Sequence, residues 1–192
     1  MKILMVHAMD EEKGNIELPG HELCFCKTGF GKVKAGLAAF AAILDTKPDL
    51  VLNFGSSGSI HHEIGDIFIC SRFIDRDLKK VAIPGVISEL DFSQELENAS
   101  LLRNYRKTYS VNTGDSFVTK PEDAGDDSDV IDMEAFAIAS ACKKTNLPFI
   151  SVKYVSDVVG KNSVKAWTDK LSDAKRELEK YIVNLSIQDF SL

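Results

Sequence analysis

Short apolar runs alternate along this chain with segments that have helical character. Residues 50–54 and 147–155 are almost continuously apolar, which is typical of strands buried on both faces of a sheet. Residues 32–44 are rich in alanine and contain no proline, which favours a helix, and a second helix is predicted at residues 135–146. Further strands are predicted at Ile3–Val6, within the region 23–33 ahead of a Gly29-Phe30-Gly31 turn, at Asp66–Phe73 and at Thr108–Asn112, with a short helix around Phe92–Leu102.

The last predicted helix begins near Asn162-Ser163, whose side chains can cap it. Strands that alternate with helices, several of them fully apolar, predict an α/β fold. A length of 192 residues suits one domain with a substantial core. We therefore expect a single α/β domain over residues 1–192, with a mixed central β-sheet flanked by helices. The apolar positions of the last helix follow helical spacing: Val164, Trp167, Leu171, Ala174, Leu178 and Ile182.

Several connecting segments are predicted as turns or loops. His7–Glu12 follows the first strand, and residues 119–129 form an acidic loop. Residues 55–59 (GSSGS) follow an apolar strand and are predicted as a turn. Such a turn offers backbone N–H groups and hydroxyls to a purine or another oxygen-rich ligand, or it is a plain tight turn.

Charge and cysteine content narrow the choice of partners. The net charge of −6 and the pI of about 5.3 argue against nucleic acid or an anionic membrane as the main partner. No apolar run approaches the roughly 20 residues that span a bilayer, so the expected location is the cytoplasm. The four cysteines contain no C-x-x-C pair and are expected to be buried free thiols: Cys24, Cys26, Cys70 and Cys142.

Three carboxylates are predicted to meet at one edge of the sheet. Glu12 lies in the turn after the first strand, Glu134 lies with Asp132 where a helix opens, and Asp157 follows a buried strand. Ligands of open α/β sheets bind at the carboxyl ends of the strands, so these acids suggest acid/base chemistry on a small polar ligand. Taken singly, Asp132 and Glu134 could instead stabilise a helix N-terminus, and Asp157 could cap a turn.

Three other motifs have simpler interpretations. The segment GFGKVKAG lacks the third glycine of a dinucleotide fingerprint, because that position is Lys34, so a turn leading into a helix is sufficient. The triplet His61-His62-Glu63 has no evident third metal ligand, and a solvated loop is favoured over a metal site. Trp167 lies on the apolar face of the last helix, which by itself favours a role in the core.

Taken together, the motifs resemble those of the purine nucleoside phosphorylase/nucleosidase superfamily, and within it most closely the 5′-methylthioadenosine/S-adenosylhomocysteine nucleosidases. The resemblance runs nearly from end to end, and its pieces occur in the family's order at compatible spacing. These pieces are KILMVHAMDEE, TGFGKVKAGLA, NFGSSGSIHHEIGDI, TGDSFV, DMEAFAIA and PFISVKYVSDVVG.

The resemblance implies a nucleoside phosphorylase-like fold and a set of catalytic residues. Glu12 matches the carboxylate that activates the attacking water, and Asp157 matches the general acid that protonates N7 of the leaving purine. Ser156 matches the neighbour that positions this acid. Two carboxylates on opposite sides of the bond also agree with the general chemistry of glycoside hydrolysis.

The resemblance implies a substrate-binding set as well. Met133 and Glu134 match residues that hold the ribose, Phe117 and Val118 match the pair that flanks the purine, and Trp167 matches an aromatic that covers the 5′ substituent. The full set of implied binding residues is Ala8, Met9, Ser56, Ser57, Gly58, Phe117, Val118, Met133, Glu134 and Trp167.

One position favours hydrolysis over phosphorolysis. Phosphorylases of the superfamily usually carry an arginine just before the glycine turn, where it binds phosphate, and this chain has Asn53. The charge of Glu12 would also repel phosphate. Two alternatives stay open: a purine nucleoside phosphorylase, for which Arg72, Arg76, Lys32 and Lys34 are the candidate cations, and a non-catalytic nucleoside-binding protein on the same scaffold.

The resemblance further implies a homodimer that needs neither metal nor cofactor, with a place in methionine salvage. The chain is shorter than its relatives, and the deficit is expected around residues 78–110, which in the family contribute to the ligand pocket and to a dimer contact. The 5′ substituent therefore stays open among methylthioadenosine, adenosylhomocysteine, 5′-deoxyadenosine and another purine nucleoside such as futalosine.

Overall fold

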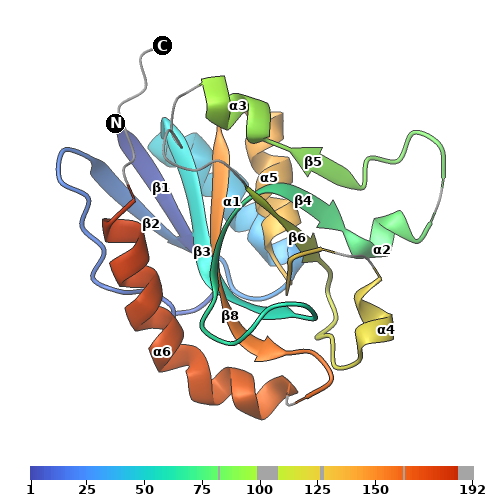
Figure 1. The fold of residues 1–192 in the computed structure, drawn as a ribbon. Coiled ribbons are helices and arrows are strands. Elements are labelled where there is room, and N and C mark those ends of the chain that lie inside the picture. The colour runs from blue at the N-terminus through green and yellow to red at the C-terminus, as the bar shows by residue number, and fades with distance from the viewer. Residues whose placement is uncertain (82, 99–107, 126–127, 162, 186–192) are drawn as a thin grey trace.

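A mixed β-sheet lies at the centre of the molecule, and helices cover both of its faces (Figure 1). The structure is a computed structural model that describes residues 1–81, 83–98, 108–125, 128–161 and 163–185, and in this part of the chain the sheet has eight strands. The predicted α/β fold with a mixed central sheet is confirmed. The strands are β1 Lys2–His7, β2 Glu22–Lys27, β3 Leu50–Ser59, β4 Ile67–Asp75, β5 Glu89–Asp91, β6 Tyr109–Thr113, β7 Val130–Asp132 and β8 Phe149–Val158.

Five of the strands pair in a closed ring. Strand β8 joins β3 to β4, β6 lies beside β4, and β7 joins β6 back to β3 through the pair Gly58–Ile131. Strands β1 and β2 continue the sheet beyond β3. Strand β5 pairs with β4 on the side opposite β6. Because β1, β3 and β8 run parallel to one another, their carboxyl ends lie at the same edge.

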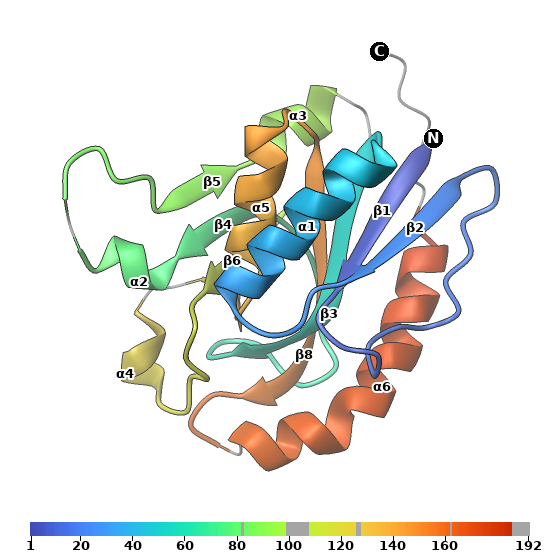
Figure 2. The ribbon, with the colours of Figure 1, turned by 180° about the vertical axis from the view of Figure 1, so that it is seen from behind.

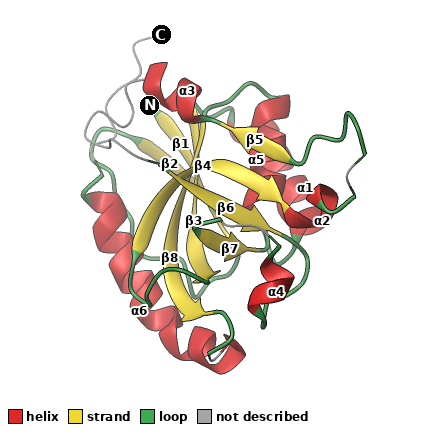
Figure 3. Ribbon diagram, turned by 45° about the vertical axis from the view of Figure 1, so that its right-hand side comes forward, coloured by secondary structure: helices red, strands yellow, loops and turns green. Residues whose placement is uncertain are grey.

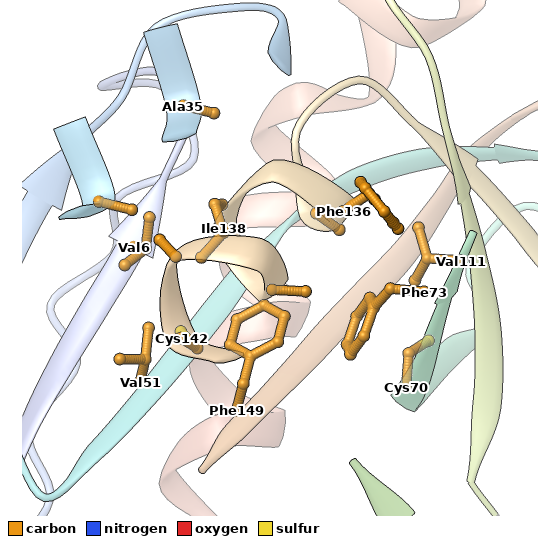
Figure 4. Packing of buried hydrophobic residues seen from close by; sticks show 14 of the residues in the cluster. Val6, Ala35, Val51, Cys70, Phe73, Val111, Phe136, Ile138, Cys142 and Phe149 are labelled. Carbon is orange, nitrogen blue, oxygen red and sulfur yellow. The ribbon is translucent and has the colours of Figure 1, made fainter. Parts of the chain in front are cut away.

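One face of the sheet is covered by α1 and α5, which lie in front of the strands in Figure 2. In Figure 4, Phe136 of α5 lies beside the strand residues Phe73 and Val111, and Cys142 lies near Phe149. Ala35 of α1 belongs to the same buried cluster. The small side chains of α1 allow the two helices to approach the sheet closely, and their burial supplies much of the hydrophobic stabilisation. The helices are α1 Lys32–Thr46, α2 Arg76–Lys79, α3 Ser93–Asn98, α4 Pro121–Ala124, α5 Ala135–Lys144 and α6 Ser163–Val183.

The opposite face is covered by α6, which crosses the sheet on the side away from α1 and α5 (Figure 3). Ala174, Leu178 and Ile182 of α6 are fully buried and pack against strand residues that include Met5 and Leu52. These three helix positions are among those that the helical spacing predicts to face inward. The predicted cap at Asn162-Ser163 lies outside the described residues.

Two strands are longer than predicted. Gly55–Ser59 is not a turn: it forms the second half of β3, because β8 continues beside it with a bulge between Ser57 and Gly58. Ser156 and Asp157 likewise lie inside β8 rather than just past its end. A bulge re-aims side chains, which suits a strand segment beside a ligand site.

The region 75–132 is also more regular than predicted. The short strands β5 and β7 and the one-turn helices α2 and α4 are not predicted, because three or four residues carry no usable periodicity. Helix α4 begins at Pro121 inside the predicted acidic loop, at a position where proline is favoured. Helix α3 falls within the predicted helix at Phe92–Leu102, whose last residues lie outside the described part of the chain.

All four cysteines are free, as predicted, but only Cys70 and Cys142 are buried. Cys24 and Cys26 are half-buried because β2 is an edge strand, so the prediction of four buried thiols is wrong for these two. Among the described helices, none has both the length and the apolar composition that crossing a bilayer requires.

Candidate active site

The carboxyl ends of β1, β3, β6, β7 and β8 surround a cavity of about 140 Å³. This is the edge at which α/β sheets bind their ligands. Every residue that the sequence singles out for the site lines this cavity except Ser156, whose side chain is buried beneath it. The lining residues are Ala8, Met9, Glu12, Phe30, Ser56, Ser57, Gly58, Ser116, Phe117, Val118, Ile131, Asp132, Met133, Glu134, Asp157, Val159 and Trp167.

Glu12 accepts three hydrogen bonds, two of them from Ser56 on β3. Its Oε1 accepts the backbone N–H of Ser56 at 2.8 Å and the Ser56 hydroxyl at 2.9 Å, and its Oε2 accepts the Ala8 N–H at 3.1 Å. The carboxylate also lies directly over Gly55, where an added Cβ would come within 2.7 Å of Oε1. A carboxylate that accepts hydrogen bonds on both oxygens is fixed in position.

Asp157 reaches the same cavity from the end of β8. Its Oδ1 lies 3.0 Å from Ser156 Oγ, which is also 3.1 Å from the carbonyl oxygen of Ser57. Burial raises the pKa of Asp157, and the hydrogen bond from Ser156 lowers it by less, so the pKa lies above the ordinary value for an aspartate. The carboxyl group therefore keeps its proton to a higher pH than a surface aspartate does.

Asp132 and Glu134 lie close together but have different surroundings. Asp132 accepts the Thr113 hydroxyl at 2.6 Å and the Ala135 N–H at 2.9 Å, and it forms an ion pair of 2.9 Å with the buried Lys153. It thus stabilises the N-terminus of α5, one of the roles predicted for this acid. Burial lowers the pKa of Lys153, but Asp132, Glu134 and Glu12 together raise it by more, so its pKa lies above the ordinary value for a lysine.

Glu134 faces the cavity with one hydrogen bond, which Oε1 accepts from the Gly31 N–H at 2.9 Å. Burial raises the pKa of Glu134 to about 7, and the charge of Asp132 adds to this effect. A carboxyl group that ionises near neutrality fits a site that binds a polar ligand.

Replacing Glu134 by Gln is expected to stabilise the ligand-free protein as the pH rises. A carboxyl group whose pKa is raised on folding supports the fold fully below its unfolded value of 4.5, and this stabilisation is lost as the pH rises through about 7. Gln keeps the acceptor for the Gly31 N–H and cannot ionise. Relative to the wild type, the variant's free energy of unfolding should be higher at pH 8 than at pH 4 by on the order of 3 kcal/mol. Urea unfolding of both proteins at the two pH values measures it, and parallel pH dependences would contradict it.

Three aromatic rings form the outer wall of the cavity. Trp167 meets the rings of Phe30 and Phe117 edge-on, each at a centroid distance of 6.3 Å. The two phenylalanines are 51% and 39% exposed, so the wall lies at the mouth of the cavity. Trp167 is half-buried there and does not belong to the sheet-facing core that Ala174 and Leu178 form.

Arg76 fixes the loop that carries Phe117. Its guanidinium is buried and donates to the carbonyl oxygens of Asn112, Asp132, Gly114 and Ser116. A Cβ on Gly114 would lie 2.5 Å from this guanidinium, so the loop passes the arginine as closely as glycine allows. Arg76 therefore acts as a brace for the cavity wall and does not line the cavity.

Other predicted features lie away from the cavity. Asn53 is buried, donates to the Val6 carbonyl and accepts the Ser151 hydroxyl, so it links strands inside the sheet. His62 lies against Phe68 and 3.4 Å from Asp129. The described residues contain no cluster of three or more His, Cys, Asp or Glu that could hold a metal ion.

Five lining residues are not in the predicted site: Phe30, Ser116, Ile131, Asp132 and Val159. Phe30 could have been found, since an aromatic residue between two turn glycines has no core to enter. Ser116 is next to the predicted Phe117, and Val159 lies two residues after Asp157. Ile131 and Asp132 belong to β7, which is too short to be predicted.

A mixed sheet with a carboxylate-lined cavity at the ends of its strands defines a class of ligand-binding α/β proteins. Within this class the chain belongs to the phosphorylase superfamily, whose family model matches residues 7–185. The superfamily that the motifs resemble is thereby confirmed.

Among individual relatives, the chain is 26% identical to the 5′-methylthioadenosine/S-adenosylhomocysteine nucleosidase of Bacillus cytotoxicus, over 96% of this chain and 98% of the relative. Its fold is similar to a mutant nucleosidase of this type from Helicobacter pylori, solved with 5′-methylthioadenosine in the active site, with a TM-score of 0.81 at 20% identity over 96% and 97% of the two chains. It is also similar to futalosine hydrolase of Helicobacter pylori, with a TM-score of 0.78 at 21% identity over 94% and 95%.

Proposed function

We propose that the protein hydrolyses the N-glycosidic bond of a purine nucleoside of the 5′-methylthioadenosine/S-adenosylhomocysteine type and releases the free base. The observation that carries the proposal is the convergence of Glu12, Glu134 and Asp157 on one cavity from three separate segments. Each carboxyl group has a different environment, which allows different roles at one pH. The nucleosidases among the relatives support the same reaction.

Glu12 acts as the general base. Its carboxylate is held by the Ser56 and Ala8 donors and takes a proton from the water that attacks the anomeric carbon. As the new bond from water to this carbon forms, the bond from the carbon to the purine nitrogen breaks. The sugar passes through a state with oxocarbenium character, which a nearby negative charge stabilises.

Asp157 acts as the general acid. Its raised pKa keeps a proton available, which it gives to N7 of the purine as the glycosidic bond breaks. Ser156 lies beneath it and orients the carboxyl group. The base thus leaves as a neutral molecule.

The remaining lining residues bind the nucleoside. Glu134 accepts hydrogen bonds from the ribose hydroxyls beside Met133, and Phe117 and Val118 flank the purine. Ala8, Met9 and the β3 residues Ser56, Ser57 and Gly58 complete the pocket around the sugar and the base. Trp167 covers the 5′ substituent.

The charge of the cavity favours water over phosphate as the nucleophile. Four carboxyl groups line the cavity, and among the described residues no arginine or lysine does. Three of the four candidate cations are engaged elsewhere: Arg76 binds backbone carbonyls, Arg72 binds Glu89, and Lys32 binds Asp75 and Asp77. The fourth, Lys34, is exposed and does not line the cavity. The non-catalytic alternative is disfavoured by the completeness of the carboxylate set.

Incubation with 5′-methylthioadenosine, S-adenosylhomocysteine, 5′-deoxyadenosine, futalosine and adenosine tests the proposal. Release of the free base from at least one of them is expected, and binding without release would favour a nucleoside-binding protein. A place in methionine salvage follows if methylthioadenosine is the preferred substrate, and the cytoplasmic location stays a prediction.

Replacing Trp167 by Ala is expected to change substrate preference. The ring lies at the cavity mouth, so its loss removes an apolar contact from a 5′-alkylthio group but none from the 5′-hydroxyl of adenosine. The kcat/KM for methylthioadenosine should fall by roughly 1–3 kcal/mol more than that for adenosine. An unchanged ratio of the two values, with a lower Tm, would assign the ring to packing alone.

We also propose that the protein is a homodimer, formed through the outer face of α1. Val33, Leu37 and Leu44 are 72%, 69% and 56% exposed and lie with Phe40 on one stripe of the helix. The stripe is adjacent in the chain to the exposed Phe30, which lines the cavity. An apolar patch of this kind marks an association surface, and a second copy would bury it beside the site. A solution mass of 21.2 kDa at micromolar concentration would contradict this proposal.

A further inference from the structure

A chain of hydrogen bonds joins Trp167 to Glu12. The indole Nε1–H of Trp167 donates to Ser56 Oγ at 3.0 Å, and the Ser56 hydroxyl donates to Glu12 Oε1 at 2.9 Å. We propose that Trp167 positions the general base through Ser56, in addition to covering the pocket. This inference rests on the proposed function and adds a role for the indole nitrogen that ring packing does not require.

The direction of the chain follows from the inventory of donors. The indole nitrogen can only donate, so a lone pair of the Ser56 hydroxyl must accept from it. A serine hydroxyl carries a single proton and rotates freely unless its neighbours fix it. With Trp167 on its acceptor side, the Ser56 hydroxyl directs its proton at Glu12.

Glu12 depends on this proton for its orientation. Two of its three donors come from Ser56, the backbone N–H and the hydroxyl, and both meet Oε1. The other oxygen, Oε2, accepts a hydrogen bond from the backbone N–H of Ala8, which directly follows β1. Because a hydroxyl that accepts a hydrogen bond becomes a better donor, the indole N–H strengthens the contact that aligns the carboxylate.

The two hydrogen bonds link three segments that are distant in the sequence. Trp167 lies on α6, Ser56 lies on β3, and Glu12 lies between β1 and β2. The helix that carries Trp167 at the mouth of the cavity is therefore connected to Glu12, the general base. In this arrangement, the position of Trp167 over a bound nucleoside and the orientation of the Glu12 carboxylate are coupled.

The covering role and the donor role can be separated by one substitution. Phe at position 167 keeps an aromatic ring against Phe30 and Phe117 but has no N–H. Trp167→Phe should lower kcat roughly 2–10-fold, the usual net worth of one hydrogen bond, and leave KM nearly unchanged. A double-mutant cycle with Ser56→Ala then tests the connection.

The contact can also be observed without turnover. Trp167 is the single tryptophan of the chain, so a ¹⁵N-labelled sample has a single indole N–H resonance. Ser56→Ala should move its proton signal upfield, because a hydrogen-bond acceptor is lost. Ser57→Ala is the matched control: the Ser57 hydroxyl donates to the Tyr154 carbonyl, so the indole signal should stay in place.

The expected result is an upfield shift in Ser56→Ala together with a Trp167→Phe effect on kcat that shrinks below about twofold in the Ser56→Ala background. Equal losses in both backgrounds, or an indole signal indifferent to Ser56, would overturn the inference while leaving the proposed function intact. A wild-type protein that releases no base would overturn the proposed function and the inference together. The Tm of each variant shows whether it is folded. The measurement of the indole N–H resonance uses only variants that keep Trp167.

Discussion

The variant Asp157→Asn is expected to lose roughly 10²–10⁴-fold in kcat while keeping the fold. The amide has the shape of the carboxyl group, and its oxygen can still accept from the Ser156 hydroxyl. The N–H groups of the amide are too weakly acidic to protonate the purine, so the base would have to leave as an anion. The raised pKa of Asp157 adds a second expectation for the wild type: kcat/KM falls as the pH rises through this value, because the acid form is lost.

Asp49→Asn is a suitable control for this variant. Asp49 is exposed at the opposite end of the parallel strands, where it accepts the Lys2 N–H. The two substitutions make the same chemical change at opposite edges of the sheet, and only the one at Asp157 should affect turnover. Near wild-type kcat in a folded Asp157→Asn protein would remove this residue from the mechanism.

Glu12→Gln is expected to lower kcat by a similar factor, again roughly 10²–10⁴-fold. The amide oxygen can replace Oε1 opposite the two Ser56 donors, but the amide nitrogen then faces the Ala8 N–H, donor against donor. The variant therefore loses the base and leaves one partly buried donor unsatisfied, which should cost about 1–3 kcal/mol of stability.

The neighbouring Glu11 provides the control for Glu12. It is exposed and does not line the cavity, so Glu11→Gln should match the wild type in kcat and in unfolding free energy. Comparison of the two variants by steady-state kinetics and urea unfolding separates the general effect of an amide from loss of the base. Turnover by Glu12→Gln at the rate of Glu11→Gln would contradict the role of Glu12.

The sequence predicts the elements whose patterns are local. The apolar runs of β1, β3 and β8 and the helical spacing of α1, α5 and α6 are visible within each segment, and they suffice for the fold class. The second half of β3 is different. Gly55–Ser59 resembles a turn by composition and becomes a strand only because β8, about 100 residues later, pairs with it.

The candidate site shows the same division between local and distant information. Glu12 follows β1, Glu134 directly precedes α5 and Asp157 lies near the end of β8, so each is next to a recognisable element and sequence analysis can place them at one edge. The position of Trp167 depends on where the first turns of α6 lie relative to the sheet, which helical spacing does not encode. Arg76 is a candidate phosphate ligand by its charge, yet the structure surrounds it with backbone carbonyls from segments 36–56 residues away.

The identity of the sugar product is the most direct test of the proposed reaction. The protein is incubated with 5′-methylthioadenosine in phosphate-free buffer containing a chelator, and again with added phosphate, and both products are identified by mass spectrometry. Because the cavity presents carboxylates and no arginine or lysine among the described residues, we predict adenine and free 5-methylthioribose at the same rate in both buffers. A sugar 1-phosphate whose formation requires phosphate would contradict hydrolysis and establish a phosphorylase.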